Sequence, residues 1–138
     1  MSRSGYADDF ETAEEQWALI RWRGAVNAAI RGKRGQAFLR ELGEAMDAMP
    51  VKELIADELA TASGEHCAIG VVGAARGTDM RDLDPEDAPS VAMAFGIAPA
   101  LAKEVVFMND EAAWWAETPA QRWQRMRNWV SENLTNAA

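Results

Sequence analysis

The first part of the chain carries apolar side chains at steps of three and four residues, which is the spacing of an amphipathic α-helix. Acids at residues 8, 9 and 11 occupy the first turns of this segment and Arg31 ends it, an order that suits the dipole of a helix. We therefore predict a first helix over residues 8–31 whose apolar rows face the core. One row consists of Phe10, Ala13, Trp17, Ile20 and Gly24, and the flanking row of Trp22, Val26 and Ile30.

Two further helices are predicted by the same spacing, over residues 36–49 and 51–62. Gly32 and Gly35 frame a short basic turn before the first of them. Pro50 separates the two, because proline lacks an amide hydrogen and clashes with the preceding helical turn. The inward positions are Phe38, Leu42, Ala45 and Met49 in the earlier helix, and Leu54, Ile55 and Leu59 in the later one.

Residues 67–77 fit two kinds of secondary structure. Their β-branched side chains permit a buried strand, whereas their alanines and the lack of a second strand to pair with favour a helix. We predict a helix. Its glycines, Gly70, Gly73 and Gly77, would then form a small-residue face that another helix can approach closely.

Three later helices are marked by the residues that begin them. Residues 84–95 begin with Asp-Pro, an acidic cap followed by proline at the first helical position. Residues 99–108 form the next helix. Thr118 and Gln121 have the spacing of a capping box, which opens a last helix that runs to about Leu134.

Together these segments predict an all-α fold, a compact single-domain bundle of about six or seven short helices over residues 1–138. A chain of this length fits one hydrophobic core. Apolar residues make up 49% of it, which supplies the material for that core and argues against disorder. No long linker, repeat or low-complexity run divides the sequence.

Net charge, cysteine content and hydropathy argue against several classes of protein. The formal charge of −8 argues against a general polyanion binder, whose surface would be positive overall. The single cysteine, Cys67, excludes an internal disulfide and suits a cytoplasmic protein. The longest uncharged stretch, residues 88–102, is shorter than the roughly 18–20 residues that span a bilayer. Residues 1–10 lack the apolar core of a signal peptide, so we expect no membrane partner.

Positive charge is concentrated in residues 21–40, which hold six of the fourteen basic residues and no acid. The rest of the chain carries 8 basic and 22 acidic residues. Such segregation is typical of a phosphate site or of a surface for an acidic partner. It is also explained by a solvated helix end whose cations offset the acids of neighbouring helices. The sequence leaves both readings open.

Residues 91–105 have the spacing of a helix-turn-helix pair. The second helix of the pair offers Lys103 as its one basic residue, and it follows an acidic run. We therefore interpret the pair as a packing unit and disfavour nucleic-acid binding by it.

The sequence contains no recognisable catalytic or metal-binding constellation. The acids in residues 79–87 lack the spacing, central glycine and distal glutamate of a calcium loop, and helix capping explains them. His66 and Cys67 are the only residues of their types, and neighbours in the chain point in different directions. We expect Cys67 to be buried and structural, and we expect no metal and no cofactor. Asn109-Asp110 is either a polar pair in a site or a turn, and we favour the turn.

The tryptophans fall into two groups. Trp17, Trp123 and Trp129 lie on or beside helical rows, so we place them in the core. Trp114 and Trp115 lie in the connection before the last helix, where an exposed indole is a typical anchor for a protein partner. A loop that folds its indoles onto the bundle explains them equally well. The candidate partner-binding residues are Arg21, Arg31, Lys33, Arg34, Trp114 and Trp115.

Several motifs resemble those of small proteins encoded by bacteriophages and prophages of high-GC bacteria. The similarity covers about residues 20–132. A broader set of bacterial proteins shares the later motifs, but more often has Ala-Leu where this chain has Val71-Val72-Gly73. The resemblance implies a phage origin and carries no assigned activity. The matching segments are residues 31–42 (RGKRGQAFLREL), residues 67–70 (CAIG) with Arg76-Gly77, residues 95–97 (FGI), Asn109-Asp110 and Thr118-Pro119.

Three hypotheses about function follow. The leading one is a non-enzymatic phage-type accessory protein that binds a protein partner and modulates host defence. The alternative is binding of nucleic acid or a phosphate ligand through residues 21–40. The third is an enzyme that uses Cys67, Asn109 or Asp110. The oligomeric state stays open, as does whether the basic segment and the tryptophan loop share one face.

Overall fold

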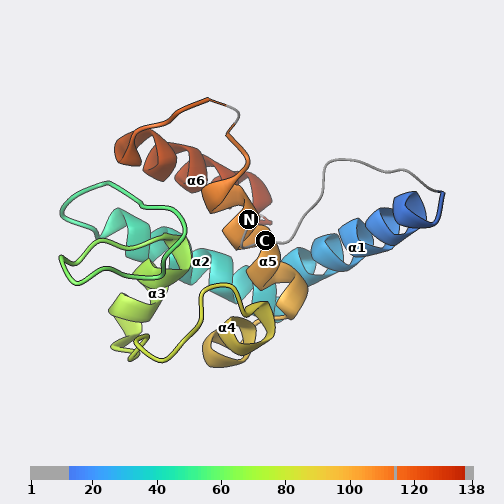
Figure 1. Cartoon of the computed structure of the whole chain (residues 1–138), viewed down its shortest axis with the longest axis horizontal. Coiled ribbons are helices and arrows are strands. Elements are labelled where there is room, and N and C mark those ends of the chain that lie inside the picture. The colour runs from blue at the N-terminus through green and yellow to red at the C-terminus, as the bar shows by residue number, and fades with distance from the viewer. Residues whose placement is uncertain (1–12, 114, 136–138) are drawn as a thin grey trace.

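The computed structural model describes residues 13–113 and 115–135, and this part of the chain forms helices joined by loops, with no sheet (Figure 1). The all-α prediction is confirmed. Phe10 and Trp114 lie outside the described residues. The six helices are α1 (Ala13–Arg31), α2 (Lys33–Asp47), α3 (Ala68–Arg76), α4 (Ala88–Phe95), α5 (Pro99–Asp110) and α6 (Pro119–Asn133).

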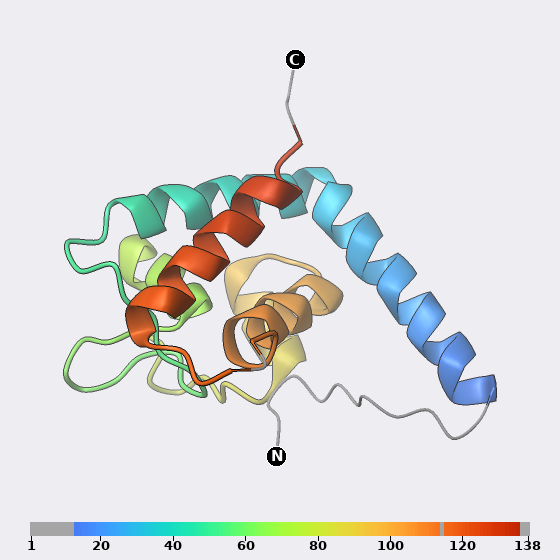
Figure 2. The ribbon, with the colours of Figure 1, turned by 90° about the horizontal axis from the view of Figure 1, so that it is seen from above.

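The central helix is α5, which contacts α1, α3, α4 and α6. The second helix, α2, packs against α1, α3 and α6, and Figure 2 shows α5 lying between the other helices. Because apolar side chains from all six helices meet here, the described residues share one core. Its fully buried side chains include Leu39, Leu42 and Met46 of α2, Leu101 and Val105 of α5, and Met126 and Val130 of α6.

The corner between α1 and α2 is tighter than predicted, because a single residue, Gly32, separates the two helices. A Cβ atom at Gly35 would lie 1.9 Å from the carbonyl oxygen of Ala29. The first turn of α2 therefore rests directly on the last turns of α1, which only a residue without a side chain permits. The predicted turn over residues 31–35 is accordingly mostly helical, and α2 begins at Lys33.

The predicted helix over residues 51–62 is wrong. This segment forms a loop in which Ala60 and His66 make an isolated antiparallel bridge. Asp57 has a φ of 70°, a left-handed conformation that a helix cannot contain. The amide of Leu54 donates to the carbonyl of Pro119 at 3.0 Å, outside its own segment. Contacts with other parts of the fold thus override a short helical pattern.

The helix predicted for the ambiguous residues 67–77 is confirmed as α3. Two of its glycines permit close approaches, but by loops and not by the second helix that was predicted, and Gly77 ends the helix with a φ of 72°. A Cβ at Gly70 would lie 1.8 Å from the carbonyl oxygen of Leu59, and one at Gly73 would lie 2.3 Å from the sulfur of Met80. Close contact of α3 with the preceding and following loops therefore depends on these two positions.

The caps of the later helices agree with the sequence in one case and differ in the other. Thr118 and Gln121 form the predicted capping box at the start of α6. The helix start predicted at Asp84 is wrong by about one turn, because Asp87 caps α4 by accepting from the amide of Ser90 at 3.2 Å. The carboxylate of Asp84 instead accepts from the amide of Glu86 in the preceding turn.

The pair α4 and α5 meets at an angle of 107°. Among the described residues no single helix has the length and apolarity to cross a bilayer, although this bent pair taken together does. The pair has the geometry of a helix-turn-helix. However, α5 is a core helix, so it does not offer the free face that a reading helix inserts into a DNA groove. Its buried residues are Ala100, Leu101, Ala102, Glu104, Val105, Val106 and Asn109.

Candidate partner-binding surfaces

Asn109 is a buried structural link, not the turn residue that the sequence predicted. It lies in the last turn of α5 with 1% of its surface exposed. Its side-chain oxygen accepts from the amide of Ala68 at 3.1 Å, and its amide nitrogen donates to the carbonyl of Ile55 at 2.8 Å. The neighbouring carboxylate of Asp110 also accepts from Asn109, at 2.8 Å. The pair therefore fastens the loop before α3 to the central helix.

Cys67 is buried, as expected, and it also caps α3. Its sulfur accepts a hydrogen bond from the amide of Gly70 at 3.5 Å, and 1% of the residue is exposed. A thiol enclosed in this way is not positioned to attack a substrate. Within the described residues, no three His, Cys, Asp or Glu side chains gather in a group that would hold a metal ion.

A buried ionic cluster at the start of α6 is absent from the sequence predictions. The carboxylate of Glu117, whose side chain is almost fully enclosed, pairs with Arg122 at 3.2 Å and with Arg125 at 2.7 Å. Arg122 also donates to the carbonyl of Asn109 at 2.9 Å. The signal in the sequence is an acid just before a helix whose first two turns carry arginines. These charges hold the connection between α5 and α6 in place.

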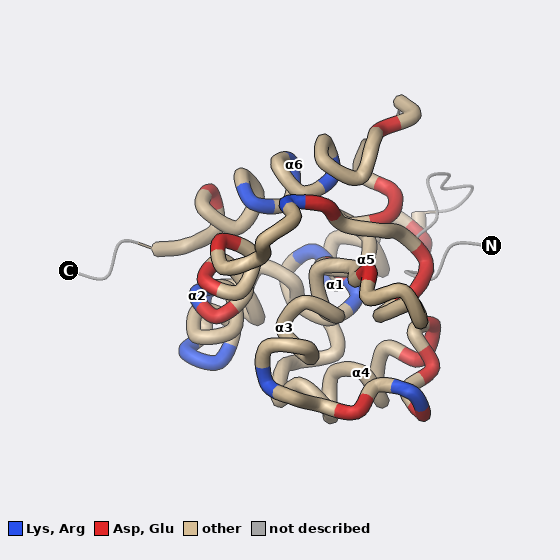
Figure 3. Tube along the Cα trace, turned by 90° about the vertical axis from the view of Figure 1, so that its left-hand side faces the viewer, with Lys and Arg blue, Asp and Glu red and all other residues tan. Residues whose placement is uncertain are grey.

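The predicted basic residues lie around the α1–α2 corner. Arg31, Lys33 and Arg34 are exposed there, and the last two line a hollow of about 250 Å³. Arg21 is exposed nearly three turns earlier on α1, and Arg23 is engaged elsewhere, in an ion pair with Glu104 at 2.8 Å. Figure 3 shows basic segments on α1, α2 and α6, whereas the edge near α4 and α5 is mostly acidic.

The described tryptophans only partly follow the predictions. Trp123 and Trp129 are buried, as expected. The core position predicted for Trp17 is wrong, because 61% of this residue is exposed; Ile20 in the same row is also exposed. Trp115 is 46% exposed beside a shallow groove of about 390 Å³ on α6. Figure 2 shows the α5–α6 connection far from the α1–α2 corner, so the predicted partner-binding residues do not form one surface.

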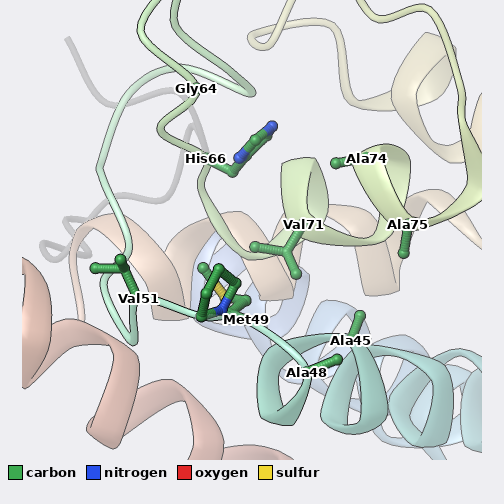
Figure 4. Close-up of a pocket in the computed structure, with 10 residues that line it drawn as sticks. Ala45, Ala48, Met49, Val51, Gly64, His66, Val71, Ala74 and Ala75 are labelled. Atoms are coloured by element: carbon green, nitrogen blue, oxygen red, sulfur yellow. The ribbon is translucent and has the colours of Figure 1, made fainter.

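An apolar groove lies between the end of α2, α3 and the loop that joins them (Figure 4). It has a volume of about 430 Å³. In Figure 4, Val71 and Ala75 of α3 face Ala45 and Ala48 of α2 across the hollow, and the imidazole of His66 projects toward Ala74. The complete lining is Ala45, Ala48, Met49, Pro50, Val51, Gly64, His66, Val71, Ala74 and Ala75.

A second hollow of about 220 Å³ continues this groove along the loop. The two share Met49, Val51, Gly64 and His66 in their linings. We call the two hollows together the α2–α3 groove. Sequence reasoning missed it because the helix predicted over residues 51–62 would have carried Ile55 into the core. Ile55 is instead half-buried and lines the second hollow.

The described residues form an all-α domain with an apolar groove between α2 and α3. No protein-family model matches the chain, and neither a curated protein nor a solved structure matches it. The resemblance to phage proteins remains a prediction from the motifs.

Proposed function

We propose that this chain is a non-enzymatic protein-binding module that holds an apolar segment of a partner in the α2–α3 groove. The single observation that carries the proposal is the larger hollow of this groove, which has a volume of about 430 Å³ and a lining that is apolar except for the imidazole of His66. We further propose, from the motifs, that the chain is a phage-type accessory protein that acts in the cytoplasm of a bacterial host and modulates its defence.

The chemistry of the groove favours a helix or an extended segment that projects aliphatic or aromatic side chains. Small alanines on α2 and α3 let such side chains approach the helix backbones closely, and Met49 is flexible enough to adapt to their shape. Side chains that fill an apolar pocket and leave water behind dominate the affinity of many interfaces. His66 at the rim offers one polar contact that would orient the segment.

Capture of a partner by matched variants tests this proposal. Ala74 is exposed on α3 inside the groove, and Ala37 is exposed on α2 and is not part of the lining. Ala74→Glu places a charge in the groove without touching the core, whereas Ala37→Glu adds the same charge elsewhere. We expect the wild-type chain and Ala37→Glu to retain the same host protein at micromolar concentration, and Ala74→Glu to lose at least tenfold in affinity.

Two results would count against the proposal. If the wild-type chain retains no host protein at micromolar concentration, protein binding is wrong as the function. If Ala74→Glu retains the partner as well as Ala37→Glu does, protein binding stands but the groove is not where it occurs. Far-UV circular dichroism of both variants checks that the helices are intact.

The α1–α2 corner supports a second candidate, the binding of nucleic acid or another phosphate ligand. The observation in its favour is that Arg31, Lys33 and Arg34 are exposed at this corner, where Lys33 and Arg34 line one small hollow. Contacts between cations and phosphates release counterions, so binding should weaken steeply with salt, by a slope of about −2 to −3 for three contacts. Replacing all three with alanine should abolish it. Binding that is absent or insensitive to salt rules this candidate out.

A further inference from the structure

The first helix has two apolar faces, of which the fold uses one. Val26 and Ile30 are buried, and Trp22 packs beside them. Trp17 and Ile20 lie on the other side of the helix and are 61% and 59% exposed. At 3.6 residues per turn, Trp17 and Val26 point in nearly opposite directions, so a rotation of the helix cannot bury both.

Among the described residues, no other helix packs along the N-terminal half of α1. Figure 2 shows it reaching beyond the other helices, with none of them alongside it. Residues 13–20 include no buried side chain. A short helix without tertiary packing is marginal in water, and helices that are apolar on two sides normally bury both. The exposed apolar row is therefore what we expect of a surface that packs against another helix.

We propose that the outer face of α1 pairs with the same face of a second copy of this chain, with the two helices antiparallel and related by a two-fold axis. The exposed row consists of Ala13, Trp17, Ile20 and Gly24, and its spacing is symmetric about the point between residues 18 and 19. Reversal of the helix direction therefore lays Trp17 against Ile20 of the partner subunit. It also lays Ala13 against Gly24 of the partner subunit.

The size of the side chains suits this arrangement. Reversal places each large residue beside a large residue and each small residue beside a small one, so the two helices keep an even separation. Gly24 has open space where a Cβ would lie, with no other atom within 4 Å. Close approach at Gly24 would bring Ala13 of the partner subunit into contact at each end of the exposed row. A contact that uses the same patch on both subunits is the usual form of a homodimer.

The charges on α1 favour pairing with a second copy of this chain, and they favour an antiparallel arrangement of the two helices. Glu14 and Arg21 are exposed and lie seven residues apart, so they occupy the same flank of the row. In the antiparallel pair, Glu14 comes within about 3 Å, measured along the helix axis, of Arg21 of the partner subunit. Because of the two-fold symmetry, this ion pair occurs twice in the dimer. In a parallel pair, the flank that holds Glu14 and Arg21 would face the opposite flank of the partner helix, so this pairing would not form.

The strength of the pairing follows from its size. A helix of 19 residues is about 28 Å long, so one pair of faces buries less than the roughly 1,200–2,000 Å² of a typical stable interface. We therefore expect a reversible dimer that forms in the micromolar range. Because α1 contributes nothing to the lining of the α2–α3 groove, this inference is independent of the proposed function.

Sedimentation of the full chain at about 1–500 µM tests the inference. We expect a monomer–dimer equilibrium that Ile20→Glu shifts toward monomer by at least tenfold. Met93→Glu is the matched control, because Met93 is 85% exposed on α4. It should leave the equilibrium unchanged, as should Ala74→Glu. All three substituted positions are exposed, so the fold should persist, and circular dichroism verifies this.

Charge reversal makes the test specific for the antiparallel register. Glu14→Arg and Arg21→Glu should each weaken the dimer, and the double variant should restore it. A chain that stays monomeric at about 500 µM overturns the inference. So does a dimer that Ile20→Glu leaves intact, or a double variant that is no stronger than the single ones. In each of these cases the capture experiment on the groove stands unaffected.

Discussion

At the scale of single residues, Asn109 joins segments that helix packing alone does not reach. Replacement by alanine leaves the amide of buried Ala68 and the carbonyl of Ile55 without their partner. Each unsatisfied buried group costs about 1–3 kcal/mol, so we expect Asn109→Ala to lower the free energy of unfolding by about 2–4 kcal/mol. Urea denaturation followed by circular dichroism measures this.

Asn128 provides the control for this prediction. It is exposed on α6 and its side chain pairs with that of Gln124. Asn128→Ala should change the free energy of unfolding by no more than about 0.5 kcal/mol. Equal stability of the two variants would show that Asn109 is not the link that its hydrogen bonds indicate.

The role of Asn109 also shows which features of single residues could not be predicted from the sequence. The motif Asn109-Asp110 is visible in the chain, and it draws attention as a polar pair. Its partners Ala68 and Ile55 lie more than 40 residues earlier, so no local pattern connects them. The same holds for Trp17, whose spacing fits the core as well as it fits an outer face. Local periodicity gives the direction of a side chain around its helix, but not what faces it.

At the scale of elements, we expect alanine substitution to have opposite effects on stability at two glycines, Gly35 at the α1–α2 corner and Gly24 within α1. Alanine at Gly35 would bring its Cβ to 1.9 Å from a backbone oxygen, so the two helices must separate. We expect Gly35→Ala to destabilise the chain by about 2–3 kcal/mol. Gly24 lies within α1 with open space around it, so Gly24→Ala should stabilise the helix by about 0.5–1 kcal/mol.

Thermal unfolding at low protein concentration measures the stability of both glycine variants relative to the wild type. The opposite signs are the informative part, since both changes add one methyl group to a helical glycine. A melting temperature for Gly35→Ala at or above that of the wild type would mean that the corner is looser than the structure shows.

Two ion pairs fasten α2 to its neighbours and make stability depend on pH. Hydrogen bonds from Arg76 hold the pKa of Glu41 below its usual value, against the opposing effect of partial burial. Hydrogen bonds from Arg127 lower the pKa of Asp47 in the same way. A lowered pKa in the folded state means that the stabilisation is complete above the unfolded pKa. It is lost as pH falls through the folded one.

We therefore expect the free energy of unfolding to decrease as pH falls below about 4.5, and Glu41→Gln to flatten part of this decrease. Because both pairs are partly exposed, each should contribute no more than about 0.5–1 kcal/mol. Urea denaturation at pH values from about 6 to 3 checks this. Glu44→Gln, at an exposed site on the same helix, is the control and should follow the wild-type profile.

Two helix ends were predicted well because a residue at the end fixes the start or the stop, whereas the similar signal at Asp84 misplaced the start of α4 by about one turn. The Thr118 capping box and Pro50 act through the backbone of their own turns, so their effect can be read locally. Residues 51–62 have helical spacing but no such signal at their start, and they form a loop. The α2–α3 groove exists because of that loop, and for this reason the candidate site could not be predicted from the sequence.

At the scale of the whole molecule, the helices are not equally tied together. The central helix α5 contacts four others, so loss of its packing removes most of the core at once. Val26 and Ile30 attach the second half of α1 to this unit. Residues 13–20 lack such anchors. The chain should therefore have one cooperative core and an arm that opens by itself.

Hydrogen exchange separates these two parts. In a dilute sample, where any self-association is dispersed, amides of residues 17–20 should exchange at least about 100-fold faster than those of residues 101–106 in α5. Exchange in the core requires global unfolding, whereas the arm needs only the loss of a few helical hydrogen bonds. If the two regions exchange at the same rate in dilute solution, the arm is held by contacts within its own chain. The exposed row of α1 would then need no second copy to remain helical.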